Sequence, residues 1–139
     1  MNLNSKTGIL PSQEINTAIE SHIISAGQPI AHDQVQPASI DLRLDKTAYR
    51  VRASFLPGSQ ATVKDKLKHI TMHKIDLSNG AVLERGCVYI VPIQERLDLP
   101  ADISGMANPK SSTGRLDIFT RVITDKATEF DRISPGYMG

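Results

Sequence analysis

The sequence predicts a mainly β fold, either a barrel or a sandwich, preceded by one short helix. Much of the chain consists of short segments in which apolar and polar residues alternate, the period of a half-buried strand. Proline and glycine residues separate these segments, as in folds built from many short strands. The 139 residues suffice for one domain with its own core. We expect a single domain over residues 1–139, with a helix at about 11–25 and a β region at about 38–139.

The predicted helix has a start signal, an apolar face and a stop signal. Pro11 is followed by Ser, Gln and Glu, residues typical of a first helical turn. Gly27 marks the end of the segment. The apolar residues that fall on one helical face are Ile15, Ala18, Ile19 and Ile23.

The strands follow from alternation and from turn dipeptides. Residues 40–44 and 49–55 alternate in the manner of half-buried strands, with Tyr49, Val51, Ala53 and Phe55 on one side. Asn79-Gly80 and Arg85-Gly86 predict tight turns. Val63, Leu67 and Ile70 allow a short helix among lysines. Further strands are predicted at residues 87–91, 96–99, 103–106 and 118–123.

Composition narrows the classes of partner. Sixteen basic and fifteen acidic residues give a net charge of +1, which argues against a protein that wraps long nucleic acid. Cys87 is the single cysteine, so no internal disulfide can form, and its apolar neighbours predict a buried, inert thiol. No apolar run approaches the ~20 residues of a membrane helix, and residues 1–6 do not resemble a signal peptide. We expect a cytoplasmic protein without membrane contact.

One segment, Pro109 to Leu116, combines the residue types that hold an anion such as phosphate. It offers two cations, three hydroxyls and a glycine that lets backbone N–H groups approach a ligand. It lacks the Walker spacing, and a plain surface turn remains the alternative interpretation. The residues concerned are Lys110, Ser111, Ser112, Thr113, Gly114 and Arg115.

This segment and two others, in this order, resemble the dCTP deaminase and dUTPase superfamily. Residues 37–44 contain Ala-Ser-Ile-Asp-Leu, similar to the family's Ala-x-x-Asp-Leu strand. Residues 110–115 are similar to its Arg/Lys-Ser-Ser-x-x-Arg loop, in the form of the deaminase branch. Residues 134–139 are similar to its Asp-x-Gly-Tyr/Trp-x-Gly turn. The resemblance covers nearly the whole chain.

The resemblance implies a fold and a reaction. The fold would be a dUTPase-like distorted β-barrel or jelly-roll with a short N-terminal helix. The reaction would be the hydrolytic deamination of dCTP to dUTP and ammonia in pyrimidine deoxynucleotide biosynthesis. Mg²⁺ would arrive with the triphosphate, since phosphate oxygens supply its ligands. A homotrimer is also implied, because the family builds its sites between subunits.

The resemblance also assigns roles to residues. Ser111 and Arg115 match the family's catalytic serine and arginine. Ser134 stands where the family usually has an aspartate, which removes a carboxylate from the site. Tyr137 either stacks on the nucleoside or caps the core. The substrate-binding set implied is Lys110, Ser111, Ser112, Thr113, Gly114, Arg115, Ser134 and Tyr137.

A catalytic zinc is not expected. Zinc deaminases need a His/Cys ligand set with a Pro-Cys-x-x-Cys pair, and this chain has one cysteine. His69 and His73 are four apart, as on one helical face, but a solvated face is the interpretation that their lysine-rich surroundings favour. In the family a glutamate past the position of Gly139 activates water. We therefore expect the chain to be a fragment of a longer polypeptide and inactive alone.

Several alternatives remain open from the residues. The chain could be a dUTPase-type hydrolase, or a non-catalytic nucleotide-binding or assembly module. Glu129 and Asp131 could replace the missing base, but solvated loop charges are expected. Asp41 could face a ligand or end a strand by hydrogen bonding. Arg115 could instead pair with Asp117 or be a plain exposed cation.

Overall fold

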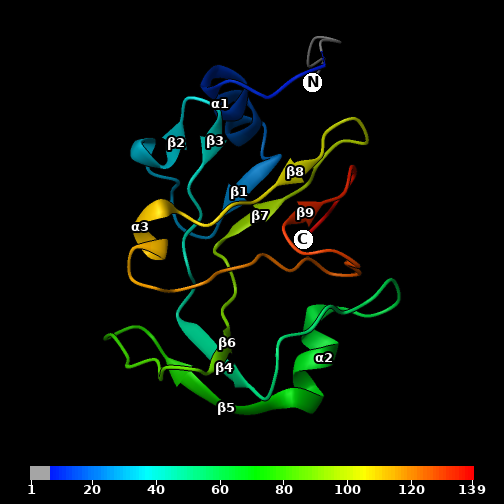
Figure 1. Ribbon diagram of the computed structural model, residues 1–139. Coiled ribbons are helices and arrows are strands. Elements are labelled where there is room, and N and C mark those ends of the chain that lie inside the picture. The colour runs from blue at the N-terminus through cyan, green and yellow to red at the C-terminus, as the bar shows by residue number, and fades with distance from the viewer. Residues whose placement is uncertain (1–6) are drawn as a thin grey trace.

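The computed structural model describes residues 7–139, and within them strands outnumber helices. The elements form two groups (Figure 1). Residues 46–90, here the α2 lobe, form a three-stranded sheet with helix α2. Residues 7–45 and 91–139, here the α1 lobe, contain helix α1, three two-stranded sheets and the short helix α3. The three sequence blocks of the candidate site all belong to the α1 lobe.

Helix α1 spans Ser12–Glu20 and buries one face. Ile15 and Ala18 form the core of this lobe together with Ile24 of strand β1 (Ile24–Ala26). The prediction that the helix reaches residue 25 is wrong, because α1 ends at Glu20. His22 has a φ of 60°, which ends the helix, and β1 is then free to pair with β7 (Glu95–Leu97).

The other two small sheets position the site. The 3₁₀ helix η1 (His32–Gln34) leads into β2 (Val35–Gln36), which pairs with β3 (Ser39–Ile40). Strand β8 (Gly105–Met106) pairs with β9 (Arg132–Ile133), so the chain before α3 lies beside the chain before the final turn.

The strand predicted over residues 40–44 is found only as far as Ile40. The Asp41 backbone N donates to the Gln34 carbonyl at 2.8 Å, and the Asp41 carbonyl accepts from Gln34 Nε2 at 2.9 Å. These bonds replace a strand ladder. Leu44 forms an isolated bridge with Ile93 and is 61 % exposed, so the alternation here does not mark a buried face.

The α2 lobe has the antiparallel strand order β5-β4-β6. The strands are β4 (Thr47–Val51), β5 (Thr71–Asp76) and β6 (Val88–Ile90). A bulge between Arg50 and Val51 shifts the register, so that Ala48 and Val51 are both buried. The strand predicted over residues 49–55 is confirmed as far as Val51, where β4 ends, and of its predicted apolar side Ala53 is exposed.

Local signals in the α2 lobe were more reliable. The short helix is confirmed as α2 (Val63–Ile70), with the Thr62 side chain capping its first turn. The turns at Gly80 and Gly86 are confirmed, with φ angles of 80° and 74°. Cys87 is half-buried rather than buried, and its Sγ accepts from Arg50 Nη2 at 2.8 Å.

Two further expectations concern the rest of the chain. Residues 118–123 form no strand, although all of them are described. Ile118 and Phe119 are 47 % and 79 % exposed, so the apolar run covers no core. Between residues 7 and 139, no helix is both long and apolar enough to cross a bilayer.

Candidate active site

The segment predicted to hold an anion forms a single helical turn, α3 (Ser111–Gly114). The Lys110 carbonyl accepts from Thr113 N at 3.0 Å and from Gly114 N at 3.2 Å. The Gly114 N–H is thereby used inside the turn, while the role of Gly114 beside a phosphate stays a prediction. The exposed side chains of the turn remain available for a ligand.

Those side chains face solvent. Lys110, Ser111, Ser112 and Arg115 are exposed, and Thr113 is half-buried. Among residues 7–139 no ion pair involves Arg115, so the alternative pair with Asp117 does not form. The candidate catalytic serine and arginine thus lie on one short, accessible element.

An ion pair between Lys110 and Asp41 joins this element to the first sequence block. The two residues lie 69 positions apart. The Asp41 carboxylate is 30 % exposed and the Lys110 side chain 62 %. Asp41 was expected either to face a ligand or to end a strand by hydrogen bonding. Its backbone forms hydrogen bonds with Gln34 where the strand ends, and its carboxylate pairs with Lys110 of the candidate loop.

A buried charged network lies behind Asp41, and sequence reasoning missed it. The Glu95 carboxylate, 1 % exposed, pairs with Arg43 Nε at 2.7 Å and accepts from Gln34 Nε2 at 3.0 Å. It also accepts from the Arg43 backbone N at 2.8 Å. Burial alone would raise the pKa of the Glu95 carboxyl, but the hydrogen bonds from Arg43 and Gln34 outweigh it and lower that pKa below its ordinary value.

The third block is a tight turn that follows β9. Gly136 has a φ of 71°, which favours glycine, and Tyr137 N donates to the Ser134 carbonyl at 3.2 Å. Ser134 is exposed. Tyr137 is half-buried, and burial raises the pKa of its phenol. The Tyr137 carbonyl accepts a hydrogen bond of 2.9 Å from Leu99 N. This bond fixes the turn to the chain near Pro100.

The second and third blocks come together through the sheet. Strand β8 ends four residues before Lys110, and its partner β9 ends directly before Ser134. Ala107 N also donates to the Asp131 carbonyl at 2.8 Å. Figure 1 shows β8 and β9 beside each other, with the chain running from β8 to α3.

Comparison with known proteins identifies the family. The family model described as 2'-deoxycytidine 5'-triphosphate deaminase (DCD) N-terminal domain matches residues 6–139. The chain belongs to the dCTP deaminase family.

Relatives within the dCTP deaminase family support this assignment at several levels of sequence identity. A dCTP deaminase of Shewanella amazonensis is 31% identical over 134 residues, covering 91% of this chain and 66% of that protein. A dUMP-forming dCTP deaminase of Corynebacterium glutamicum is 27% identical, covering 94% of this chain and 65% of that protein. The crystal structure of the Agrobacterium tumefaciens 2'-deoxycytidine 5'-triphosphate deaminase matches with a TM-score of 0.92 and 59% identity.

The structural match covers 96% of this chain and 40% of the Agrobacterium tumefaciens chain. The prediction of a mainly β, dUTPase-like fold is confirmed. The chain therefore spans less than two thirds of the curated relatives, and a smaller share of the solved one.

Two acids weighed as substitute bases have partners in this member of the dCTP deaminase family. Glu129 is 63% exposed and pairs with Arg132 at 3.4 Å, as expected of a loop charge. Asp131 differs from the expectation of a solvated charge. Its carboxylate is 19% exposed, pairs with Arg121 and accepts from Val122 N at 2.7 Å. It fixes the loop that precedes β9.

The two histidines are exposed, as the favoured interpretation of a solvated face predicts. His69 lies in α2 and His73 in β5, so the two do not share a helical face, although both are exposed. Within residues 7–139 no three His, Cys, Asp or Glu side chains come together in a metal-binding arrangement.

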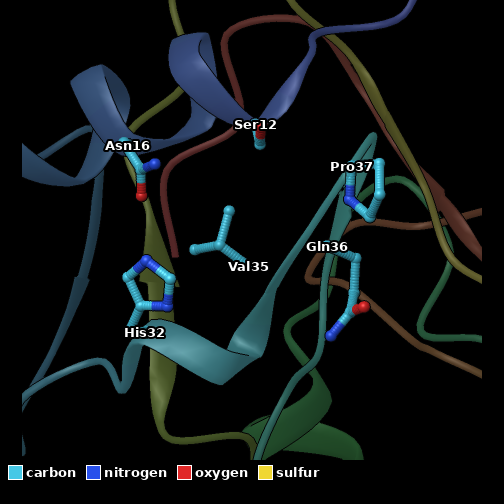
Figure 2. Close-up of a pocket in the computed structure, with 6 residues that line it drawn as sticks. All are labelled: Ser12, Asn16, His32, Val35, Gln36 and Pro37. Atoms are coloured by element: carbon cyan, nitrogen blue, oxygen red, sulfur yellow. The ribbon is translucent and has the colours of Figure 1, made fainter.

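A shallow hollow of about 260 Å³ lies between α1 and the η1–β2 segment. Figure 2 shows Val35 at its centre, between His32 and the α1 residues Ser12 and Asn16. None of the predicted site residues lines it. Its mixed lining of apolar and polar residues was not foreseen from the sequence.

Proposed function

We propose that the protein is a hydrolytic dCTP deaminase that produces dUTP and ammonia. The observation that carries the proposal is that Ser111 starts the exposed turn α3 and Arg115 directly follows it, in a chain of the dCTP deaminase family. The same turn carries Lys110, Ser112, Thr113 and Gly114 for the nucleotide. Ser134 and Tyr137 belong to the turn after the neighbouring strand, β9.

In the proposed reaction, the oxygen of a water molecule bonds to C4 of the cytosine as a general base takes its proton. The C4–N bond then breaks, and the amino group takes up a proton and leaves as ammonia. The Ser111 hydroxyl would orient the water, and the Arg115 guanidinium would stabilise the negative charge that develops. We assign the base to neither Glu129 nor Asp131, since both carboxylates are paired with arginines.

No zinc takes part in this proposal, because a single cysteine cannot supply the ligand pair of zinc deaminases. Mg²⁺ belongs to the substrate, bound to the triphosphate oxygens. We further propose a homotrimer in the cytoplasm that acts on free dCTP, with no role for long nucleic acid or membranes.

The test is ammonia and dUTP release from dCTP by the full-length protein, with Ser111→Ala and Arg115→Ala beside the wild type. Arg115→Ala should weaken dCTP binding by more than tenfold, since a charge-assisted contact is worth roughly 1.5–3 kcal/mol. Arg85→Ala is the matched control, because Arg85 is an exposed arginine of the α2 lobe. Equal affinity of a folded Arg115→Ala protein would remove Arg115 from the site.

The same assay separates the other candidates by their products. A relative from Corynebacterium glutamicum is named as dUMP-forming. That activity would release ammonia, pyrophosphate and dUMP from dCTP with two waters. Pyrophosphate from dUTP without ammonia would indicate a dUTPase, and nucleotide binding without any product would indicate a non-catalytic module.

A further inference from the structure

The Lys110–Asp41 ion pair is the contact that ties α3 to the first sequence block. Its two members are held very differently. Asp41 is fixed through its backbone, because its N–H and its carbonyl both bond to Gln34, at 2.8 Å and 2.9 Å. Gln34 is 7 % exposed and also donates to the buried Glu95 carboxylate. The Asp41 side chain therefore projects from a rigid base.

Lys110 is the mobile partner by its chemistry. Its flexible four-carbon stem carries an ammonium with three donors. Its side chain is 62 % exposed, whereas its backbone carbonyl is held by the first turn of α3. The carboxylate of Asp41 thus determines where the ammonium lies relative to Ser111, the next residue. Donors not used by Asp41 still face solvent and can meet an anion.

We propose that Asp41 is a positioning residue for the phosphate groups of the substrate. It holds the Lys110 ammonium at the start of α3, so that the triphosphate meets an already oriented cation. Ordering a lysine side chain costs rotamer entropy, and the ion pair supplies that order before the nucleotide binds. This inference rests on the proposed function, because it takes the anion to be the triphosphate of dCTP.

The test variant is Asp41→Asn in the full-length protein. The asparagine is isosteric, and both Gln34 bonds use backbone atoms of residue 41, so the local fold is retained. Asp45→Asn is the control with the same change of charge. Asp45 is exposed, and its side chain forms no ion pair within the described part of the chain.

Steady-state kinetics with dCTP give the readout. Asp41→Asn should raise KM about three- to fivefold, the size expected when an exposed ion pair no longer orders a lysine, and change kcat by less than about twofold. Asp45→Asn should change neither constant. Lys110→Gln should raise KM further, and the double variant should match Lys110→Gln alone, because Asp41 acts through Lys110.

Two results would overturn the inference while leaving the proposed function intact. One is an unchanged or lower KM in Asp41→Asn, which would mean that the carboxylate competes with the phosphates. The other is an additive double variant, which would mean that Asp41 acts independently of Lys110. If the wild type binds dCTP without turnover, dissociation constants replace KM in the same comparison. If it neither binds nor converts dCTP, both proposals fall.

Discussion

The two lobes carry their charges in opposite ways. The α2 lobe, residues 46–90, holds eight of the sixteen lysines and arginines but three of the fifteen acidic residues. Its ion pairs are Lys68–Asp65, three residues apart, and Arg50–Glu84. The α1 lobe has an excess of acids. Its pairs Arg43–Glu95 and Lys110–Asp41 span 52 and 69 residues, while the pairs Arg121–Asp131 and Arg132–Glu129 are close in sequence. The first sequence block is therefore held by ion pairs with residues far away in the sequence.

This difference matches what each lobe has to do. The helix cap and the turns at Gly80 and Gly86 in the α2 lobe depend on neighbouring residues, whereas β4 pairs with β5 across helix α2 and with β6 beyond β5. A site that binds a polar ligand needs side chains fixed in particular places, which buried hydrogen bonds achieve. The candidate site lies beside the two ion pairs of the described residues that span the most sequence, Arg43–Glu95 and Lys110–Asp41.

The largest effect should come from removing the buried carboxylate. Glu95→Ala would leave Arg43 and Gln34 without their acceptor, and breaking such a pair typically costs about 3 kcal/mol of unfolding free energy or more. Urea unfolding at neutral pH measures it. Asp65→Asn, in the exposed pair of the α2 lobe, is the control and should barely move the midpoint. Equal shifts in the two variants would erase the contrast between the lobes.

The α2 lobe should instead depend on its apolar packing. Val51 is 2 % exposed and is the largest fully buried side chain of the described residues. Val51→Ala should cost about 2 kcal/mol through lost burial and the cavity left behind. Native-state hydrogen exchange should show the loss in the strand β4 and its partners. A loss of protection confined to the α1 lobe would contradict the division drawn here.

The same contrast explains which features the sequence could predict. The α2 helix and the turns at Gly80 and Gly86 depend on residues close in sequence, and all three were predicted. Residues 41–44 alternate like a strand, yet Asp41 bonds to Gln34, a choice that no local pattern reveals. Glu95 looks like a solvated acid between Gln94 and Arg96, because its partner Arg43 is distant in sequence.

The candidate site shows the same limit. The motif placed Ser111 and Arg115 on one exposed segment, and its resemblance to a family gave them roles. The motif could not show that Gly114 N–H is used inside α3, since a one-turn helix and an open loop share this composition. Nor could it show that Lys110 meets Asp41. The roles of the site residues remain predictions for the experiments above.

Lowering the pH should narrow the difference in unfolding free energy between the wild type and Glu95→Gln. The folded-state pKa of Glu95 lies below its ordinary value of 4.5, so the unfolded chain takes up the proton more readily. The carboxylate's contribution is complete above that value and is lost as the pH falls through the folded pKa. Urea unfolding from pH 7 to pH 3 should show the two free energies converging. Parallel curves would mean that this carboxylate is not stabilised by folding.

The smallest effect should come from the cap of α2, which isolates local stabilisation in its simplest form. Thr62 Oγ1 accepts from Asp65 N at 3.1 Å, and losing such an N-cap costs about 1 kcal/mol. Thr62→Ala should lower the unfolding free energy by that amount, whereas Thr62→Ser keeps the hydroxyl and should retain most of it. Neither variant should alter dCTP affinity, because the cap makes no contact with α3. Equal losses in both variants would show that the methyl group matters rather than the cap bond, and a change in affinity would show that the α2 lobe shapes the site after all.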